Sequence, residues 1–186
     1  KLILGSQSPR RAELLQNLGL EYDVRVTHAD ERAPNELGPS ETAVYVSEQK
    51  AKALQVTLIE GELGITSDTE VWLDGVRFGK PEGVNDAIRM LNALSGCTHE
   101  VVSGLSLVEP HSITSYSSTV LVQFDEIPTW AIDHYVNTFK PLDKAGAYGI
   151  QEWIGMAFIS KIEGEYNSVV GLPTATLMKA LAPYRK

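Results

Sequence analysis

Residues 6–11, with the sequence SQSPRR, combine two guanidinium groups with a serine placed directly before a proline. Ser8 suits the N-cap of a helix, and Pro9 suits its first position, where the missing N–H costs nothing. Such a loop presents free backbone N–H groups beside Arg10 and Arg11, and this combination binds phosphate well. The same pattern also fits a solvent-exposed helix start whose arginines pair with nearby acids.

Two lysines are further candidates for binding phosphate. Lys50 falls on the apolar face of a predicted helix, where a charge is costly unless it is paired or faces a cleft. A lysine whose stem lies on apolar surface and whose ammonium reaches water is the commoner explanation of this pattern. Lys80 stands between Gly79 and Pro81, a setting that holds its backbone firmly but is also common in surface turns. Because a proline replaces the Ser or Thr of a Walker A motif, this segment is not a P-loop.

Two carboxylates have the chemistry to hold a hard divalent cation such as Mg²⁺ or Mn²⁺. Asp68 follows the apolar run 63–66, so we expect it at the carboxyl end of a strand, where α/β sheets place functional groups. Glu31 lies in a polar loop interrupted by Pro34. Asp68 as a turn cap and Glu31 as an exposed acid remain the structural alternatives. The four histidines show no metal-ligand spacing, and no serine-hydrolase elbow or dinucleotide fingerprint occurs.

The composition limits the class of partner. The chain has 186 residues, 43% of them hydrophobic, and this length and hydrophobic content predict a single domain spanning residues 1–186. Its formal net charge is -8. An acidic body does not capture a nucleic-acid backbone, so we expect no nucleic-acid partner. A nucleotide site in this chain would need a concentrated cluster of Lys and Arg side chains and a divalent cation.

A single cysteine, Cys97, excludes an internal disulfide framework and a cysteine-rich zinc site. This usage is typical of a reducing compartment, and we expect the cytoplasm. No apolar stretch approaches the roughly 20 residues that cross a bilayer, so no membrane association is predicted.

Strand and helix patterns alternate along most of the chain and predict an α/β protein with a mixed central sheet flanked by helices. The expected strands are 2–4, 22–26, 63–66, the hairpin 71–73 with 76–78, the antiparallel pair 101–108 with 115–124, and 156–162. The expected helices begin at Pro9, after Ser40, after Asn85 as the N-cap, at Pro128 and after Pro173.

Several of these segments form a characteristic series. They are SQSPRR at 6–11, Glu31, Lys50-Ala51, Asp68-Thr69, Gly79-Lys80-Pro81, DKAGAYGIQ at 143–151 and YNSVVGLP at 166–173. In this order they resemble the Maf family of nucleotide pyrophosphatases, and the match runs nearly end to end. No single segment is specific, whereas their joint occurrence is.

The resemblance implies hydrolysis of a nucleoside triphosphate between its α- and β-phosphates, with Mg²⁺ or Mn²⁺, by a homodimer. The implied fold has two lobes around a cleft and is shared with inosine triphosphate pyrophosphatases. Asp68 is implied as the catalytic carboxylate and a metal ligand, and Glu31 as a second metal-site acid. The implied substrate-binding residues are Ser8, Arg10, Arg11, Lys50, Lys80 and Gln151. The stretch that ends at Gln151 resembles the branch that prefers dTTP and UTP over 7-methyl-GTP.

Two acids depart from the family pattern. Glu70 replaces an apolar residue after Asp68-Thr69, and Glu152 replaces the usual glycine after Gln151. In an unbroken strand Asp68 and Glu70 share a face, so Glu70 would repel substrate or raise the pKa of its neighbour. These departures are the only support for an alternative function, a nucleotide-binding regulator of cell division or replication with little turnover.

Overall fold

One twisted sheet runs through the molecule, which is described for residues 1–184 by a computed structural model. The sheet is seven-stranded, in the order β2-β1-β3-β5-β6-β7, and β4 pairs with β3. Strands β1, β2 and β3 are parallel and the other pairings are antiparallel, which confirms the predicted mixed sheet. The strands are β1 (Leu2–Leu4), β2 (Tyr22–Val24), β3 (Leu63–Leu73), β4 (Val76–Phe78), β5 (Thr98–Glu109), β6 (Ser112–Phe124) and β7 (Ile159–Glu163).

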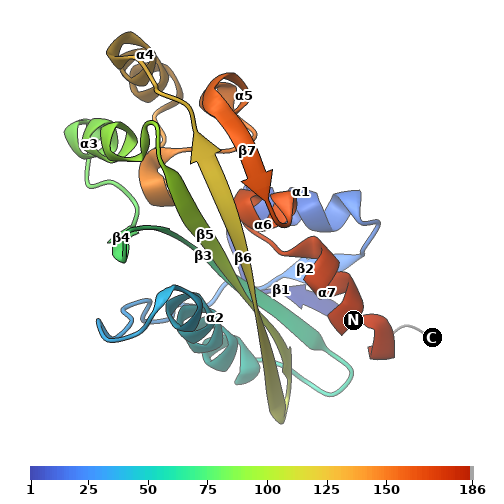
Figure 1. The fold of residues 1–186 in the computed structure, drawn as a ribbon. Coiled ribbons are helices and arrows are strands. Elements are labelled where there is room, and N and C mark those ends of the chain that lie inside the picture. Colours follow the sequence, from blue (N-terminus) through green and yellow to red (C-terminus); the bar gives the residue numbers. More distant parts are fainter. Residues whose placement is uncertain (185–186) are drawn as a thin grey trace.

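Helices cover both faces of the sheet. Figure 1 shows α2 on one face, α1, α6 and α7 on the other, and α3, α4 and α5 gathered at one end. Two apolar clusters lie toward opposite ends of β5, one around Val101 and the other around Leu105 and Leu107, and they form the cores of two lobes. The helices are α1 (Pro9–Asn17), α2 (Pro39–Gln55), α3 (Val84–Leu94), α4 (Thr129–Phe139), α5 (Trp153–Phe158), α6 (Tyr166–Val170) and α7 (Thr174–Ala180), with 3-10 turns η1 (Ala145–Ala147) and η2 (Ala182–Tyr184). None of the helices within residues 1–184 has the length and apolar character needed to span a bilayer.

Strand β3 is longer than the sequence predicted, and this length creates a gap in the sheet. On one edge β3 pairs with β1 over residues 63–65 and with β4 over residues 71–73. On the other edge it pairs with β5 from Gly64 to Trp72. Within the described chain, residues 66–70 therefore have a strand neighbour on one side only. The expected carboxyl-terminal position of Asp68 is wrong, because Asp68 lies inside β3, beyond the end of β1.

The polar middle of β3 is buried because partners distant in the sequence satisfy it. The Thr66 hydroxyl donates to the carbonyl of Ser47 on α2 at 2.8 Å, and the Ser67 hydroxyl donates to the carbonyl of Gly104 on β5 at 2.7 Å. The Thr69 hydroxyl shares a hydrogen bond of 2.7 Å with Ser103. These hydrogen bonds within the protein replace the hydrogen bonds to water that the same hydroxyl groups would make on the surface.

Helix α2 lies directly on the sheet because β5 carries a glycine at the point of contact. A Cβ atom on Gly104 would lie 2.1 Å from the carbonyl oxygen of Ala43 in α2. Nearby, the hydroxyls of Ser47 and Ser106 share a hydrogen bond of 2.8 Å between helix and strand. The helix begins at Pro39, where the Glu41 carboxylate accepts a hydrogen bond from the N–H of Gly38. This close packing fixes the position of the α2 face that lies against the sheet.

The remaining differences from the predicted elements involve short segments. Residues 153–158 form helix α5, so the expected strand 156–162 is shortened to β7. Short apolar runs do not distinguish a helix from a strand, and here Gly155 packs against the backbone of Ile150, which no local pattern reveals. Helix α6 was not predicted, and helix α3 is capped by Gly83 instead of Asn85.

His99 makes the stability of the fold depend on pH. Its ring is 2% exposed, stacks on Phe124, and places Nε2 2.7 Å from the hydroxyl oxygen of Tyr148. Burial lowers the pKa of His99 to about 4. Since the unfolded chain binds this proton near pH 6.5, stability from the neutral ring is present above that pH and is lost as the pH falls toward 4. Between pH 7 and pH 5 we expect His99 to account for a loss of about 2 kcal/mol in the free energy of unfolding.

Urea denaturation of the wild type and of His99→Gln at both pH values measures this effect. The glutamine can still bond Tyr148 but does not titrate, so the variant should lose about 2 kcal/mol less than the wild type. Equal losses in the two proteins would contradict a buried neutral imidazole.

Candidate active site

A cavity of about 610 Å³ opens at the gap along β3, a size typical of small-molecule sites. Its walls come from the start of α1, the loop after β2, the middle of α2 and of β3, the end of β4, and residues 143–151. All the site residues predicted from the sequence line this one cavity: Ser8, Arg10, Arg11, Glu31, Lys50, Asp68, Lys80 and Gln151. Segments up to 143 residues apart in sequence thus meet at one place.

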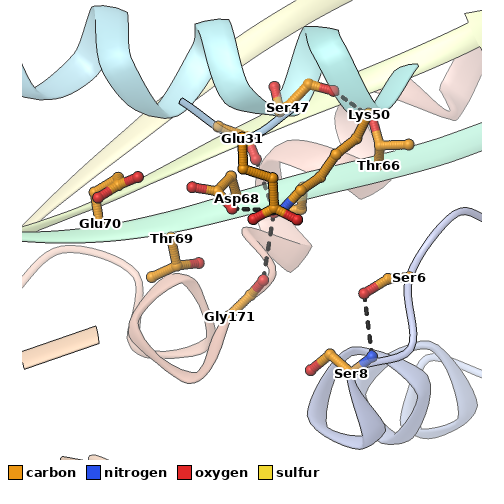
Figure 2. A network of polar contacts seen from close by, with 12 residues as sticks. Ser6, Ser8, Glu31, Ser47, Lys50, Thr66, Asp68, Thr69, Glu70 and Gly171 are labelled. Carbon is orange, nitrogen blue, oxygen red and sulfur yellow. Dashed lines mark hydrogen bonds and ion pairs between the residues drawn. The ribbon is translucent and has the colours of Figure 1, made fainter. Parts of the chain in front are cut away.

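Lys50 is the bridge between the two predicted metal-site acids. Figure 2 shows its side chain extending from α2 toward Asp68 and Glu31. The Nζ atom lies 2.6 Å from Asp68 Oδ1 and 3.2 Å from Glu31 Oε2. The side chains of Lys50 and Asp68 are 14% and 12% exposed, whereas that of Glu31 is 55% exposed. Lys50 therefore sits on the apolar face of α2 because it is paired inside the cleft, and the solvent-reaching alternative does not apply.

The two arginines at the start of α1 have different partners. Arg10 donates to Asp143 at 2.7 Å, as the structural alternative for this segment anticipated. Arg11 donates to the carbonyl of Gly171 at 2.8 Å and to the Ser6 hydroxyl at 3.1 Å, both neutral acceptors. Burial lowers the pKa of Arg11 below its usual range. Arg11 is therefore a half-buried cation whose hydrogen bonds go to neutral groups, as expected of a side chain that awaits an anion.

Ser8 occupies the expected N-cap position of α1 but forms no side-chain capping bond. Its N–H instead donates to the Ser6 hydroxyl at 3.2 Å (Figure 2). The predicted N-cap position of Ser8 is therefore confirmed, although its side chain makes no capping bond, and Pro9 lies in the first turn as expected. The Ser8 hydroxyl is left available at the cavity wall.

Glu70 faces the cavity on the same side of β3 as Asp68, because the strand is unbroken between them. Its carboxylate accepts two hydrogen bonds from Arg77 on β4, at 2.6 and 2.5 Å. Burial, together with the nearby Asp68, raises the pKa of Glu70 to about 7, although the bonds from Arg77 act to lower it. The departure from the family pattern at Glu70 is thus matched by a cation on the neighbouring strand.

The loop 143–151 is fixed by a second polar network. The Tyr135 hydroxyl donates to Glu152 and accepts from the N–H of Gly149 at 3.1 Å, and burial raises the pKa of this tyrosine. Lys144 lies 3.1 Å from Glu152 and 2.8 Å from Asp143. Burial acts to raise the pKa of Asp143, but hydrogen bonds from Lys144 and Arg10 lower it to about 2. Glu152 thus holds the loop that carries Gln151.

The cavity is locally basic in an acidic chain. Six Lys or Arg side chains and four carboxylates line it, whereas the whole chain has a net charge of -8. Lys80 has no acidic partner among residues 1–184. This is the concentrated cluster of cations that a polyphosphate site requires in such a chain.

A family model described as Maf-like protein matches residues 1–184. This chain belongs to the Maf family. A dTTP/UTP pyrophosphatase of Phocaeicola vulgatus is 45% identical over 97% of this chain and 94% of its own length. The dTTP/UTP pyrophosphatase of Bacteroides thetaiotaomicron is 43% identical over 95% of this chain and 92% of its own length.

A solved structure, a nucleoside-triphosphatase described as a dITP/XTP pyrophosphatase from Mycobacterium abscessus, aligns over 99% of this chain and 97% of its own. Its identity is 14% and its TM-score 0.44. A similarity at this level supports no conclusion about this Maf chain.

Reasoning from the sequence missed several cavity residues of this Maf protein. Arg77 was read only as part of a hairpin, and Asp143 and Lys144 only as members of a family segment. The only signal in the sequence was an arginine on one strand of a predicted hairpin and an acid shortly before the other strand. Detecting it required the register of β3 and β4, which pairs Trp72 with Arg77.

Proposed function

We propose that this Maf protein hydrolyses dTTP and UTP, or modified pyrimidine nucleotides, to the monophosphate and pyrophosphate. The observation that carries the proposal is the convergence of six cations on one cavity around Asp68. The relatives named dTTP/UTP pyrophosphatase, at 45% and 43% identity over nearly the whole chain, support the reaction and the choice of base. Six fixed positive charges suit a triphosphate better than a monoester.

In this proposal the cations of the cavity bind the triphosphate and offset the charge that develops on the phosphoryl and leaving oxygens. Arg11, held by neutral acceptors, is free to accept an anion without losing an acidic partner. Lys50 holds Asp68 in place from α2 through the 2.6 Å bond. Asp68 orients the attacking water and accepts its proton.

Glu31 and Asp68 fit the divalent cation implied by the family. Their carboxylate oxygens are the hard donors that Mg²⁺ and Mn²⁺ prefer, and both approach the same Lys50 ammonium, so a small cation can reach both. No group of three or more His, Cys, Asp and Glu residues within 1–184 is arranged to hold a metal ion. Mg²⁺ commonly uses one or two carboxylates plus substrate phosphates, so two acids suffice. When bound, the ion would supply Lewis-acid stabilisation of the phosphoryl oxygens.

Other parts of the proposal rest on the family and the composition. A homodimer, a reducing compartment such as the cytoplasm, a single domain and the absence of nucleic-acid partners stay predictions. The alternative function as a regulator with little turnover is not favoured, because Glu70 and Glu152 are paired with Arg77, Tyr135 and Lys144. The acids on which that alternative depended are therefore structural partners of neighbouring groups.

Incubation with a panel of nucleoside triphosphates and Mg²⁺ tests this proposal. We expect dTTP and UTP to be cleaved about tenfold or more faster than purine nucleotides, with pyrophosphate and a monophosphate as first products. Chromatography of the nucleotide products, together with separate assays for pyrophosphate and orthophosphate, measures both rate and reaction type.

Two results of the panel would contradict the proposal. Orthophosphate as the first product would indicate a phosphatase of another mechanism. Tight nucleotide binding without release of pyrophosphate from any nucleotide would indicate the regulator.

A further inference from the structure

We propose that Arg77 is a further substrate-binding residue that contacts a phosphate group, and that Glu70 is the positioning residue that orients its guanidinium. The inference rests on the proposed function, because it assigns these residues to the same triphosphate site. It concerns two residues outside the set that the family resemblance implies for the site.

The first support is the place of the pair in the fold. Glu70 and Arg77 both line the cavity, on the two strands of the β3–β4 hairpin. Glu70 lies two residues from Asp68 on one strand face, so the two acids are separated by about 7 Å along the strand. Lys80, another cavity cation, follows Arg77 by three residues. Arg77 thus lies on the same wall of the cavity as the Asp68 carboxylate and as Lys80, a candidate for binding phosphate.

The second support is the difference in exposure within the pair. The Glu70 side chain is 4% exposed, whereas the Arg77 side chain is 38% exposed. A buried carboxylate needs a cation, so Glu70 ties one side of the guanidinium to the sheet. More than a third of the Arg77 side chain is left accessible at the cavity wall. A pair that served stability alone would not need its cation at the cavity wall.

The third support is the pattern of hydrogen-bond donors. Glu70 accepts from Nε and from Nη2 of Arg77, which uses two of the five N–H donors of a guanidinium. No acceptor within residues 1–184 bonds the Nη1 atom of Arg77. The free donors of Nη1 and Nη2 form a planar fork that matches two phosphate oxygens. Because Glu70 fixes the plane, little side-chain freedom is lost when phosphate binds.

A double-mutant cycle tests the proposal, with inorganic pyrophosphate as the probe and calorimetric titration as the readout. We expect Arg77→Gln to weaken pyrophosphate binding about 10- to 100-fold, as the loss of charge-assisted hydrogen bonds implies. Glu70→Gln should weaken it several-fold in the wild-type background and cause no further weakening in Arg77→Gln. The double variant buries no unpaired charge, so its fold is kept even where Arg77→Gln alone unfolds.

Arg89→Gln is the matched control, because Arg89 forms an exposed ion pair with Asp86 and does not line the cavity. It should bind pyrophosphate as the wild type does. Lower melting temperatures in the Glu70 and Arg77 variants with unchanged pyrophosphate affinity would overturn the inference and leave a purely structural pair. Tighter binding by Glu70→Gln would overturn the positioning role. If the wild type hydrolyses dTTP and Arg77→Gln binds pyrophosphate normally, only the inference about Arg77 is refuted. If the wild type neither hydrolyses triphosphates nor binds pyrophosphate, the proposed function is refuted as well.

Discussion

Asp68→Asn is expected to lower kcat for dTTP about 10³-fold, which is within the range for removal of a catalytic proton acceptor. The amide is nearly isosteric with the carboxylate, but it takes no proton from water and is a poorer ligand for a divalent cation. Lys50 would keep a hydrogen-bond acceptor at this position and the Glu31 carboxylate at 3.2 Å, but it would lose the charge of Asp68. Steady-state kinetics with dTTP and Mg²⁺ measure the effect.

The melting temperature of Asp68→Asn should change little, which separates a loss of chemistry from a loss of fold. Asp133→Asn, an exposed position on α4, provides the matched control and should retain the wild-type rate. A rate for Asp68→Asn within a few-fold of the wild type would remove this carboxylate from the mechanism.

Gly104→Ala is expected to destabilise the protein by about 3 kcal/mol, near the upper end of the range for overpacking a core. The added methyl group would lie 2.1 Å from the Ala43 carbonyl oxygen and 2.8 Å from the Val44 nitrogen, and backbone atoms cannot rotate away. Helix α2 must then move off the sheet. Because α2 carries Lys50, we also expect slower turnover, even at temperatures where the variant is folded.

Urea denaturation measures the loss, with Gly79→Ala as the control. A Cβ atom at Gly79 would meet no atom within 4 Å, so its free energy of unfolding should stay within about 0.5 kcal/mol of the wild type. A Gly104→Ala protein as stable as the wild type would show that the contact between α2 and β5 is not close.

Elements with a strong local pattern could be predicted from the sequence. The β3–β4 hairpin follows from Asp74-Gly75, both in the left-handed region with φ of 50° and 76°, which a two-residue turn requires. The middle of β3 could not be predicted. The predicted strand ended at Thr66, because the polar side chains that follow are satisfied by partners such as Ser103 and Gly104, which lie up to 37 residues away.

The candidate site was predicted from the order of its segments and not from any one of them. Lys50 and Lys80 had structural explanations as good as the functional ones, and only their joint occurrence with Asp68 pointed to the family. The pairing of Glu70 with Arg77 could not be predicted from the sequence, since it depends on strand register and on burial. Both arise from the whole fold.

The one-sided pairing of residues 66–70 has a consequence for how this protein can change. The floor of the site is paired with β5 along its far edge, and these ladder hydrogen bonds resist changes in its shape. The rim consists of loops after β1 and β2 and of residues 143–151. Loops accept substitutions that strands do not. Substitutions in the rim loops can therefore change the preferred base, while the residues of β3 that carry Asp68 stay unchanged because substitutions there are costly.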